Sequence, residues 1–175
     1  MSKVTARALR EHLRNLPHDI LVEQIVSLSN RNDAIREFFA AQLGLGPQED
    51  VLAKYKAVIT REFSGRGDSF PRLSIARKAV LDYKKLAQSP LPVVDLMLHY
   101  VESGVDFTNR FGDISESFYS SVEGMYEQAL KVIRQHQLHE QFERRCKQIV
   151  TATRGIGWGF HDQLSLLYEE AFEQA

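Results

Sequence analysis

The residue types best suited to chemistry gather near the carboxyl end, at residues 155–162, which read Gly-Ile-Gly-Trp-Gly-Phe-His-Asp. Three glycines in five residues cost backbone entropy, so we expect Gly157 and Gly159 to adopt backbone angles that other residues avoid. A histidine followed by an aspartate at a helix start can act as a general acid–base pair or as metal ligands. The structural alternative is a compact turn in which Trp158 fills a gap between helices. The catalytic candidates in this stretch are His161 and Asp162.

A second loop, residues 108–114, joins the two longest predicted helices and reads Thr-Asn-Arg-Phe-Gly-Asp-Ile. Its asparagine and aspartate can satisfy backbone groups at the helix ends, and Gly112 supplies a left-handed turn. Binding loops contain the same residue types, so a pocket between this loop and residues 155–162 is the alternative. Such a pocket would make the protein a small-molecule or metal-dependent enzyme. The ligand-binding candidates in the two loops are Asn109, Asp113, Trp158 and His161.

Three carboxylates and a histidine share one face of a predicted helix, because they follow one another at spacings of 4, 3 and 4 residues. They are Asp95, His99, Glu102 and Asp106. Carboxylate-bridged di-iron bundles use Glu-x-x-His twice. This chain has the reverse order, His99-x-x-Glu102, and no second copy. We therefore predict a polar stripe that faces solvent, and we predict no metal site and no cofactor.

Charge is distributed unevenly along the chain. Residues 54–85 carry nine basic and three acidic side chains, a net charge of +6, whereas residues 95–143 carry three basic and nine acidic ones, a net charge of −6. The two regions either attract each other within the protein or present a basic face to a polyanion. The loop around Gly65 and Gly67 lacks the Gly-Lys-Ser/Thr of a phosphate-binding loop. The polyanion-binding candidates are Arg61, Arg66, Arg72, Arg77 and Lys78.

Composition excludes several classes of protein. The chain has 175 residues, a net charge of −1, 43% hydrophobic and 26% charged residues, which are values of a globular protein rather than a disordered one. It contains no long uncharged apolar run and no signal-peptide core, so we expect a cytoplasmic protein without a membrane segment. Its one cysteine, Cys146, cannot form an internal disulfide. Apolar neighbours at helical spacing predict that this thiol is buried and inert.

Apolar residues recur at helical spacing throughout, and no segment alternates with a period of two. We predict an all-α fold of about nine helices, in which N-terminal helical hairpins pack on a larger bundle, with a solenoid-like stack as an alternative arrangement. Residues 91–107 are apolar nearly all round, which predicts a helix in the middle of the core. We expect a single domain over residues 1–175, with 1–46 and 47–175 as its sub-blocks.

Three stretches carry a resemblance to a known family. They are TNRFGDI at 108–114 within the run that begins at Asp95, FYSSVEGM at 118–125, and GIGWGFHD at 155–162. Together they resemble a bacterial family of uncharacterised, all-helical cytoplasmic proteins. The resemblance implies a helical fold and a bacterial, cytoplasmic setting, and it implies no activity and no catalytic residue.

The absence of a coherent catalytic set favours a non-enzymatic function. We expect a helical interaction module that binds a protein partner or a polyanion through the face of residues 54–85. A protein partner or a second copy of the chain is the main expectation, and nucleic acid is the polyanion with weaker support. The alternative is the small-molecule or metal-dependent enzyme with its pocket between residues 108–114 and 155–162.

Overall fold

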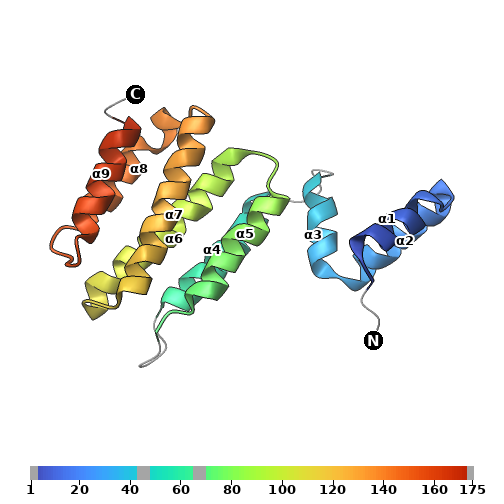
Figure 1. Cartoon of the computed structure of the whole chain (residues 1–175), viewed down its shortest axis with the longest axis horizontal. Coiled ribbons are helices and arrows are strands. Elements are labelled where there is room, and N and C mark those ends of the chain that lie inside the picture. The colour runs from blue at the N-terminus through green and yellow to red at the C-terminus, as the bar shows by residue number, and fades with distance from the viewer. Residues whose placement is uncertain (1–3, 43–47, 65–69, 173–175) are drawn as a thin grey trace. The chain divides into compact units, whose positions relative to one another are not determined.

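The computed structural model describes residues 4–42, 48–64 and 70–172. These residues form nine α-helices and no strand, which confirms the all-α prediction (Figure 1). The predicted boundary at residues 45–47 and the candidate Arg66 lie outside the described residues. The helices are α1 (Ala6–Arg14), α2 (His18–Arg31), α3 (Asp33–Gln42), α4 (Gln48–Phe63), α5 (Leu73–Leu86), α6 (Pro90–Phe111), α7 (Glu116–Gln135), α8 (His139–Ala152) and α9 (Phe160–Phe172).

The chain divides into two compact units. Unit 1 is Met1–Gly46 and unit 2 is Pro47–Ala175. The expectation of a single domain, and the packing of the N-terminal helices on the larger bundle, stay predictions.

Unit 1 consists of three short helices whose starts follow the sequence signals. The Thr5 side chain caps α1 by accepting a hydrogen bond from the Ala8 amide at 3.2 Å. Pro17 precedes the first turn of α2, where its missing N–H costs nothing. The Asn32 side chain accepts from the Ile35 amide at 3.4 Å at the start of α3. Helix α2 packs on α3, whereas neither α1 nor α2 buries any side chain.

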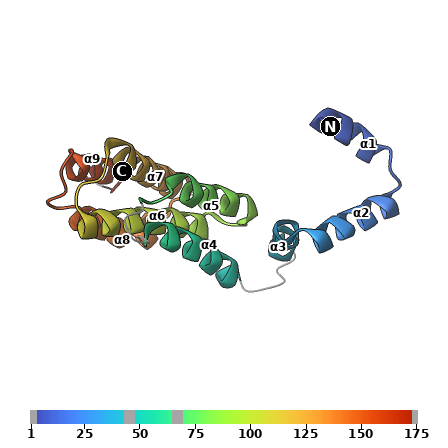
Figure 2. The ribbon, with the colours of Figure 1, turned by 90° about the horizontal axis from the view of Figure 1, so that it is seen from below.

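Unit 2 is built from three helical hairpins, α4/α5, α6/α7 and α8/α9. Figure 2 shows that they stack side by side in two layers, α4, α6 and α8 in one and α5, α7 and α9 in the other. Each hairpin contacts its neighbour along the stack, which is the arrangement of an α-solenoid. Unit 2 therefore has the solenoid-like arrangement expected as an alternative, although the sequence shows no repeat.

Helix α6 occupies the centre of unit 2, as its nearly all-round apolar sequence predicts. Eleven of its residues are buried. The Tyr100 ring packs edge-on against Phe63 of α4, with ring centroids 5.1 Å apart. One turn further along, α6 approaches α7 closely, because a Cβ atom at Gly104 would lie 2.7 Å from Val122. Cys146 of α8 is buried in the same core, and burial raises the pKa of its thiol to about 12.

The up-and-down course of the hairpins determines where the predicted loops lie. Helices α6 and α8 both run toward the end of unit 2 from which α7 and α9 start (Figure 1). The α6–α7 connection, residues 112–115, and the α8–α9 connection, residues 153–159, therefore lie at the same end of the stack.

Candidate functional site

The two loops singled out in the sequence are in contact at that end of unit 2. The Asn109 side chain donates a hydrogen bond from Nδ2 to the carbonyl oxygen of Ala152, with a distance of 3.0 Å. The Asp113 carboxylate lies beside Gly157, where an added Cβ atom would be 3.4 Å from Oδ2. That is an ordinary van der Waals distance, so the two loops touch at Gly157 without requiring glycine there. We call residues 109–113 and 154–162 together the loop surface.

Side chains of α6 and α7 fix the shape of the first loop. Gly112 has a φ of +83°, and its amide donates to the Thr108 carbonyl at 2.8 Å, which ends α6. The Tyr119 hydroxyl lies 2.8 Å from the Thr108 hydroxyl and donates to Oδ1 of Asp113 at 3.1 Å. Asp113, a predicted ligand-binding residue, therefore uses one carboxylate oxygen to hold its own loop.

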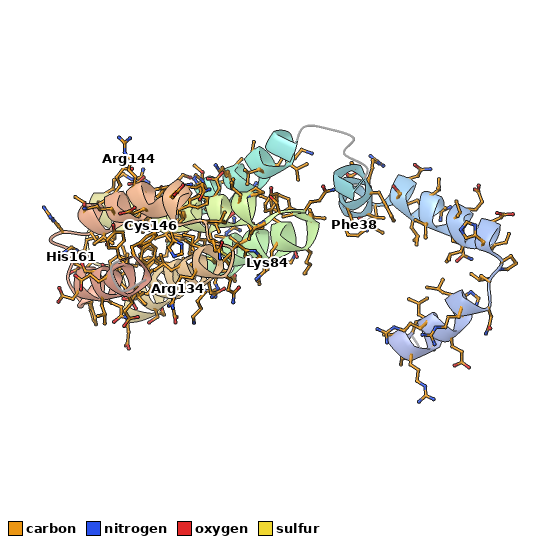
Figure 3. The ribbon with its side chains drawn as sticks, turned by 90° about the horizontal axis from the view of Figure 1, so that it is seen from above. Phe38, Lys84, Arg134, Arg144, Cys146 and His161 are labelled. Carbon is orange, nitrogen blue, oxygen red and sulfur yellow. The ribbon has the colours of Figure 1, made fainter. Side chains whose placement is uncertain are left out.

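His161 is tied to the end of α8. Its Nδ1 atom lies 2.8 Å from Oγ1 of Thr153, and that hydroxyl donates its only hydrogen to the Val150 carbonyl at 2.7 Å. The imidazole must therefore donate from Nδ1 and keep Nε2 as its acceptor when it is neutral. The ring is half-buried at the first turn of α9, where Figure 3 labels it, and Asp162 beside it is exposed. Neither residue is sealed in the core.

Trp158 faces solvent at the tip of the second loop. Its side chain is 64% exposed, so it does not fill a gap between helices as the structural alternative supposed. Its φ is +63°, in the left-handed region that favours glycine. Gly159 (φ +70°) has the conformation expected of it, whereas Gly157 does not. The other residues of the loop with a positive φ are Gly155 (φ +87°) and Trp158.

A second exposed aromatic side chain belongs to the same surface. Phe111, the last residue of α6, is 53% exposed, and its ring centroid lies 4.6 Å from that of buried Phe107. The Arg110 guanidinium lies over the Phe111 ring, 5.5 Å from its centroid. Arg110 also donates to the Phe63 carbonyl at 3.4 Å. An arginine held on an aromatic face is a common element of protein interfaces.

Two of the polyanion-binding candidates, Arg61 and Arg72, form ion pairs with the buried carboxylate of Glu62. Arg72 donates from Nε and Nη2 to the two oxygens of Glu62, at 2.7 and 3.0 Å, and Arg61 lies 3.4 Å from the same carboxylate. Glu62 is only 6% exposed, so a charged partner is needed to offset the loss of water around it. These cations therefore have a structural role between α4 and the start of α5.

Two further candidates are also paired within the chain. Arg77 donates to the carbonyl and hydroxyl oxygens of Ser121 in α7, at 3.2 and 3.3 Å. Lys78 forms an ion pair with Asp82 one helical turn away. In these contacts three of the four described candidates pair with Glu62 or Asp82 of their own segment, and the fourth binds uncharged groups of Ser121. They therefore do not test the attraction between residues 54–85 and 95–143.

Three residues of the predicted stripe on α6, Asp95, His99 and Glu102, are half-buried between neighbouring helices, whereas Asp106 faces solvent as predicted. Arg145 of α8 binds Glu102 through two hydrogen bonds of 2.6 and 2.7 Å and also binds Asp95, which forms an ion pair of 2.7 Å with Lys56 of α4. Burial alone would raise the pKa of Asp95, but the hydrogen bonds from Lys56 and Arg145 outweigh it and lower that pKa. This cluster joins α4, α6 and α8.

The histidine of the stripe belongs to the same three-helix contact. His99 Nε2 lies 2.9 Å from Oγ1 of Thr60 on α4. Burial lowers the pKa of His99, and the nearby charge of Lys56 lowers it further. The neutral imidazole is thus the favoured form in the folded protein.

The sequence of residues 1–173 matches the model of a family described as a family of unknown function (DUF6155). The chain belongs to that family. No curated protein and no solved structure matches it. Membership in DUF6155 agrees with the expected resemblance to uncharacterised proteins, while the bacterial and cytoplasmic setting stays a prediction. Since the family carries no assigned chemistry, the geometry of the chain must support any proposal about its function.

A groove between α6 and α8 carries ionisable groups. It has a volume of about 320 Å³ and is lined by His99, Glu102, Ser103, Val105, Asp106, Gln148, Ile149 and Ala152. None of the predicted ligand-binding residues of the two loops lines it. Within residues 4–42, 48–64 and 70–172, no three histidine, cysteine or acidic side chains come together to hold a metal ion. No helix in the same residues is long and apolar enough to cross a bilayer.

Proposed function

We propose that the protein is a non-enzymatic helical module that binds a protein partner through the loop surface, residues 109–113 and 154–162. The observation that carries the proposal is Trp158, a large aromatic side chain exposed on a left-handed backbone.

The left-handed backbone conformation of Trp158 costs free energy, and packing of its exposed side chain offsets little of that cost. A bulky residue in the left-handed region costs about 1–2 kcal/mol relative to the ordinary helical or extended conformations. Burial of the indole would offset that cost, but the side chain is 64% exposed. Strain of this kind is concentrated at functional sites, where a surrounding structure enforces it. A partner that buries the indole supplies the missing stabilisation.

The loop surface holds Trp158 in a fixed place. The hydrogen bond between Asn109 and the Ala152 carbonyl, and the one between His161 and Thr153, anchor the loop on both sides of the tryptophan. Because the loop is already ordered, binding loses little conformational entropy. Rigid aromatic anchors of this type provide most of the affinity in many protein interfaces.

The chemistry around Trp158 favours a protein over a polyanion. Arg110 and Arg154 are exposed on the loop surface, but Asp113 and Asp162 are exposed there as well, so the surface has no strong net charge. A polyanion would meet repulsion from both carboxylates. A protein surface with an apolar pocket for the indole and mixed charges around it fits this pattern.

The arrangement of the loops gives no comparable support to the enzyme alternative. Catalysis would require His161 and Asp162 to share a concavity with Asn109 or Asp113. Asn109 instead binds backbone at the end of α8, and one oxygen of Asp113 accepts from Tyr119. The polar groups of the loops thus build the platform that displays Trp158.

The test compares three versions of the tagged full chain in lysate of the native cells. Trp158→Asn removes the indole, and asparagine tolerates a left-handed backbone, so the fold is retained. Leu81→Asn on α5 is the matched control, because Leu81 is 52% exposed away from the loop surface. We expect specific proteins that are retained by the wild type and the control and lost by Trp158→Asn. Equal retention by all three versions would contradict the proposal.

A second arm separates the polyanion version. Fluorescence anisotropy of a labelled single-stranded oligonucleotide is followed while the salt concentration is lowered. We expect no saturable binding. Binding whose logarithm falls steeply with the logarithm of salt concentration shows several phosphate contacts and would favour the polyanion instead.

A further inference from the structure

Unit 1 contains two helices, α1 and α2, that carry exposed apolar side chains. Neither α1 nor α2 buries a side chain. Leu9 of α1 is 46% exposed. Four exposed apolar residues of α2 recur at helical spacing, Val22, Ile25, Val26 and Leu28, and Ile20 is exposed on another side. Figure 2 shows the two helices as separate short rods joined by a bend.

Helices of this length do not stand alone in water. α1 has 9 residues and α2 has 14, whereas isolated helices shorter than about 12–15 residues are marginal even with favourable sequences. Most helix stability in proteins comes from packing of the apolar face. The apolar stripes of α1 and α2 therefore need a cover outside these two helices.

The charges beside the two stripes are complementary to each other. α1 carries Arg7, Arg10 and Arg14 against the single acidic residue Glu11. α2 carries two acidic residues near its start, Asp19 and Glu23, and one basic residue, Arg31. The basic helix of one copy thus suits the acidic helix of another.

A two-fold axis would use this complementarity twice. When α1 of one copy packs on α2 of a second copy, the symmetry places α1 of the second copy on α2 of the first. Four short helices then surround one apolar core, which is the packing of a four-helix bundle. We propose that α1 and α2 form a self-association surface, whose occupant is the same pair of helices from a second copy of the chain.

Other occupants fit the two helices less well. A nucleic acid or an anionic lipid surface would pair with the arginines of α1, but Asp19 and Glu23 of α2 would be repelled by it. A nucleic acid would also leave the apolar stripes exposed to water. Another protein surface covers the apolar side chains and pairs the charges, and a second copy supplies both.

Sedimentation velocity of the full chain at rising protein concentration tests the proposal. The chain mass is 20.0 kDa, and we expect a species of twice that mass to grow with concentration. The double substitution Leu13→Asp and Ile25→Asp places charges in both stripes and should return the chain to a monomer. Leu81→Asp, on α5 of unit 2, is the control and should leave the dimer intact. A wild type that stays monomeric, or a dimer unaffected by the double substitution, overturns the proposal.

A charge exchange distinguishes pairing between copies from pairing within one chain. Variant A changes the three arginines of α1 to glutamate, and variant B changes Asp19 and Glu23 of α2 to arginine. Each variant alone has like charges on α1 and α2, so each should be monomeric. Mixed together they should form an A–B dimer, because both α1–α2 contacts are then attractive. Monomers in the mixture would contradict the proposed contact, and neither result depends on whether the loop surface binds a partner.

Discussion

The Nδ1 atom of His161 lies 2.8 Å from the Oγ1 atom of Thr153 and donates a hydrogen bond to it. Thr153 is completely buried at the end of α8, and His161 belongs to the first turn of α9. This single contact closes the loop that displays Trp158. His161, a catalytic candidate in the sequence, therefore helps to hold the loop that exposes Trp158.

Removal of that contact should loosen the loop. In Thr153→Val the imidazole loses its acceptor, which should cost about 1 kcal/mol and lower the melting temperature of unit 2 by about 2–4 °C. Thr151→Val is the control, since the Thr151 hydroxyl is exposed and binds only within its own helix. Thermal unfolding followed by the fluorescence of Trp158, the one tryptophan of the chain, measures both. Equal melting temperatures for the two variants would show that the contact is not needed.

Two glycine substitutions should change stability in opposite directions. Gly159 has a φ of +70°, so Gly159→Ala should destabilise the protein by about 1 kcal/mol. Gly124 lies inside α7, and a Cβ atom there meets open space. Gly124→Ala should therefore stabilise the protein by about 0.5–1 kcal/mol. Chemical denaturation of both variants checks the prediction, and a stabilising Gly159→Ala would contradict the left-handed backbone of the loop.

Trp158→Gly should raise stability while it removes the proposed function. Glycine takes a φ of +63° without strain, and the exposed indole contributes little packing, so we expect a gain of about 1 kcal/mol. A gain in stability with a loss of function is the sign of a residue retained for binding. Differential scanning calorimetry measures the change. A marked loss of stability would show that the indole packs on the protein after all.

His99 should make the stability of unit 2 depend on pH in mildly acidic solution. Its pKa in the folded protein is lowered by burial and by Lys56, with Glu102 acting in the opposite direction and Arg145 in the same one. The stabilisation is fully present above the ordinary histidine pKa of 6.5 and is lost as pH falls through the lower folded pKa. His99→Gln should remove this step from the pH dependence of the free energy of unfolding, measured by urea denaturation. If His99→Gln shows the same pH dependence as the wild type, another group causes the step, which would contradict the prediction.

The sequence predicts the helices of this protein well because their signals are local. The apolar run at residues 91–107 indicates a central helix, and α6 is that helix. Asn32 begins α3 as its side chain suggests, and Gly112 ends α6 with a left-handed turn. Each of these signals depends on residues within a few positions of one another.

The contacts of the candidate site could be predicted only in part, since they join residues far apart in the chain. Arg145 lies 43 residues from Glu102 and 50 from Asp95. The sequence pattern of α6 therefore does not predict that these carboxylates bind Arg145. One signal was present, because Arg145 precedes Cys146 on the inner side of α8. The glycine spacing at residues 155–162 indicates a tight turn but does not say which residue takes the left-handed backbone. Gly155 and Gly159 take it, and so does Trp158, for which the glycine spacing gives no signal.

Photo-crosslinking at position 158 tests the central claim most directly. A benzoylphenylalanine in place of Trp158 keeps an aromatic side chain at the tip of the loop, and the same group in place of Leu81 on α5 is the control for an exposed apolar position. Both proteins are irradiated in native cells, and their crosslinked products are compared by mass spectrometry. We predict a discrete crosslinked protein from position 158 that is absent from position 81. No product from position 158, or the same products from both positions, would contradict the proposal that the loop surface binds a protein partner.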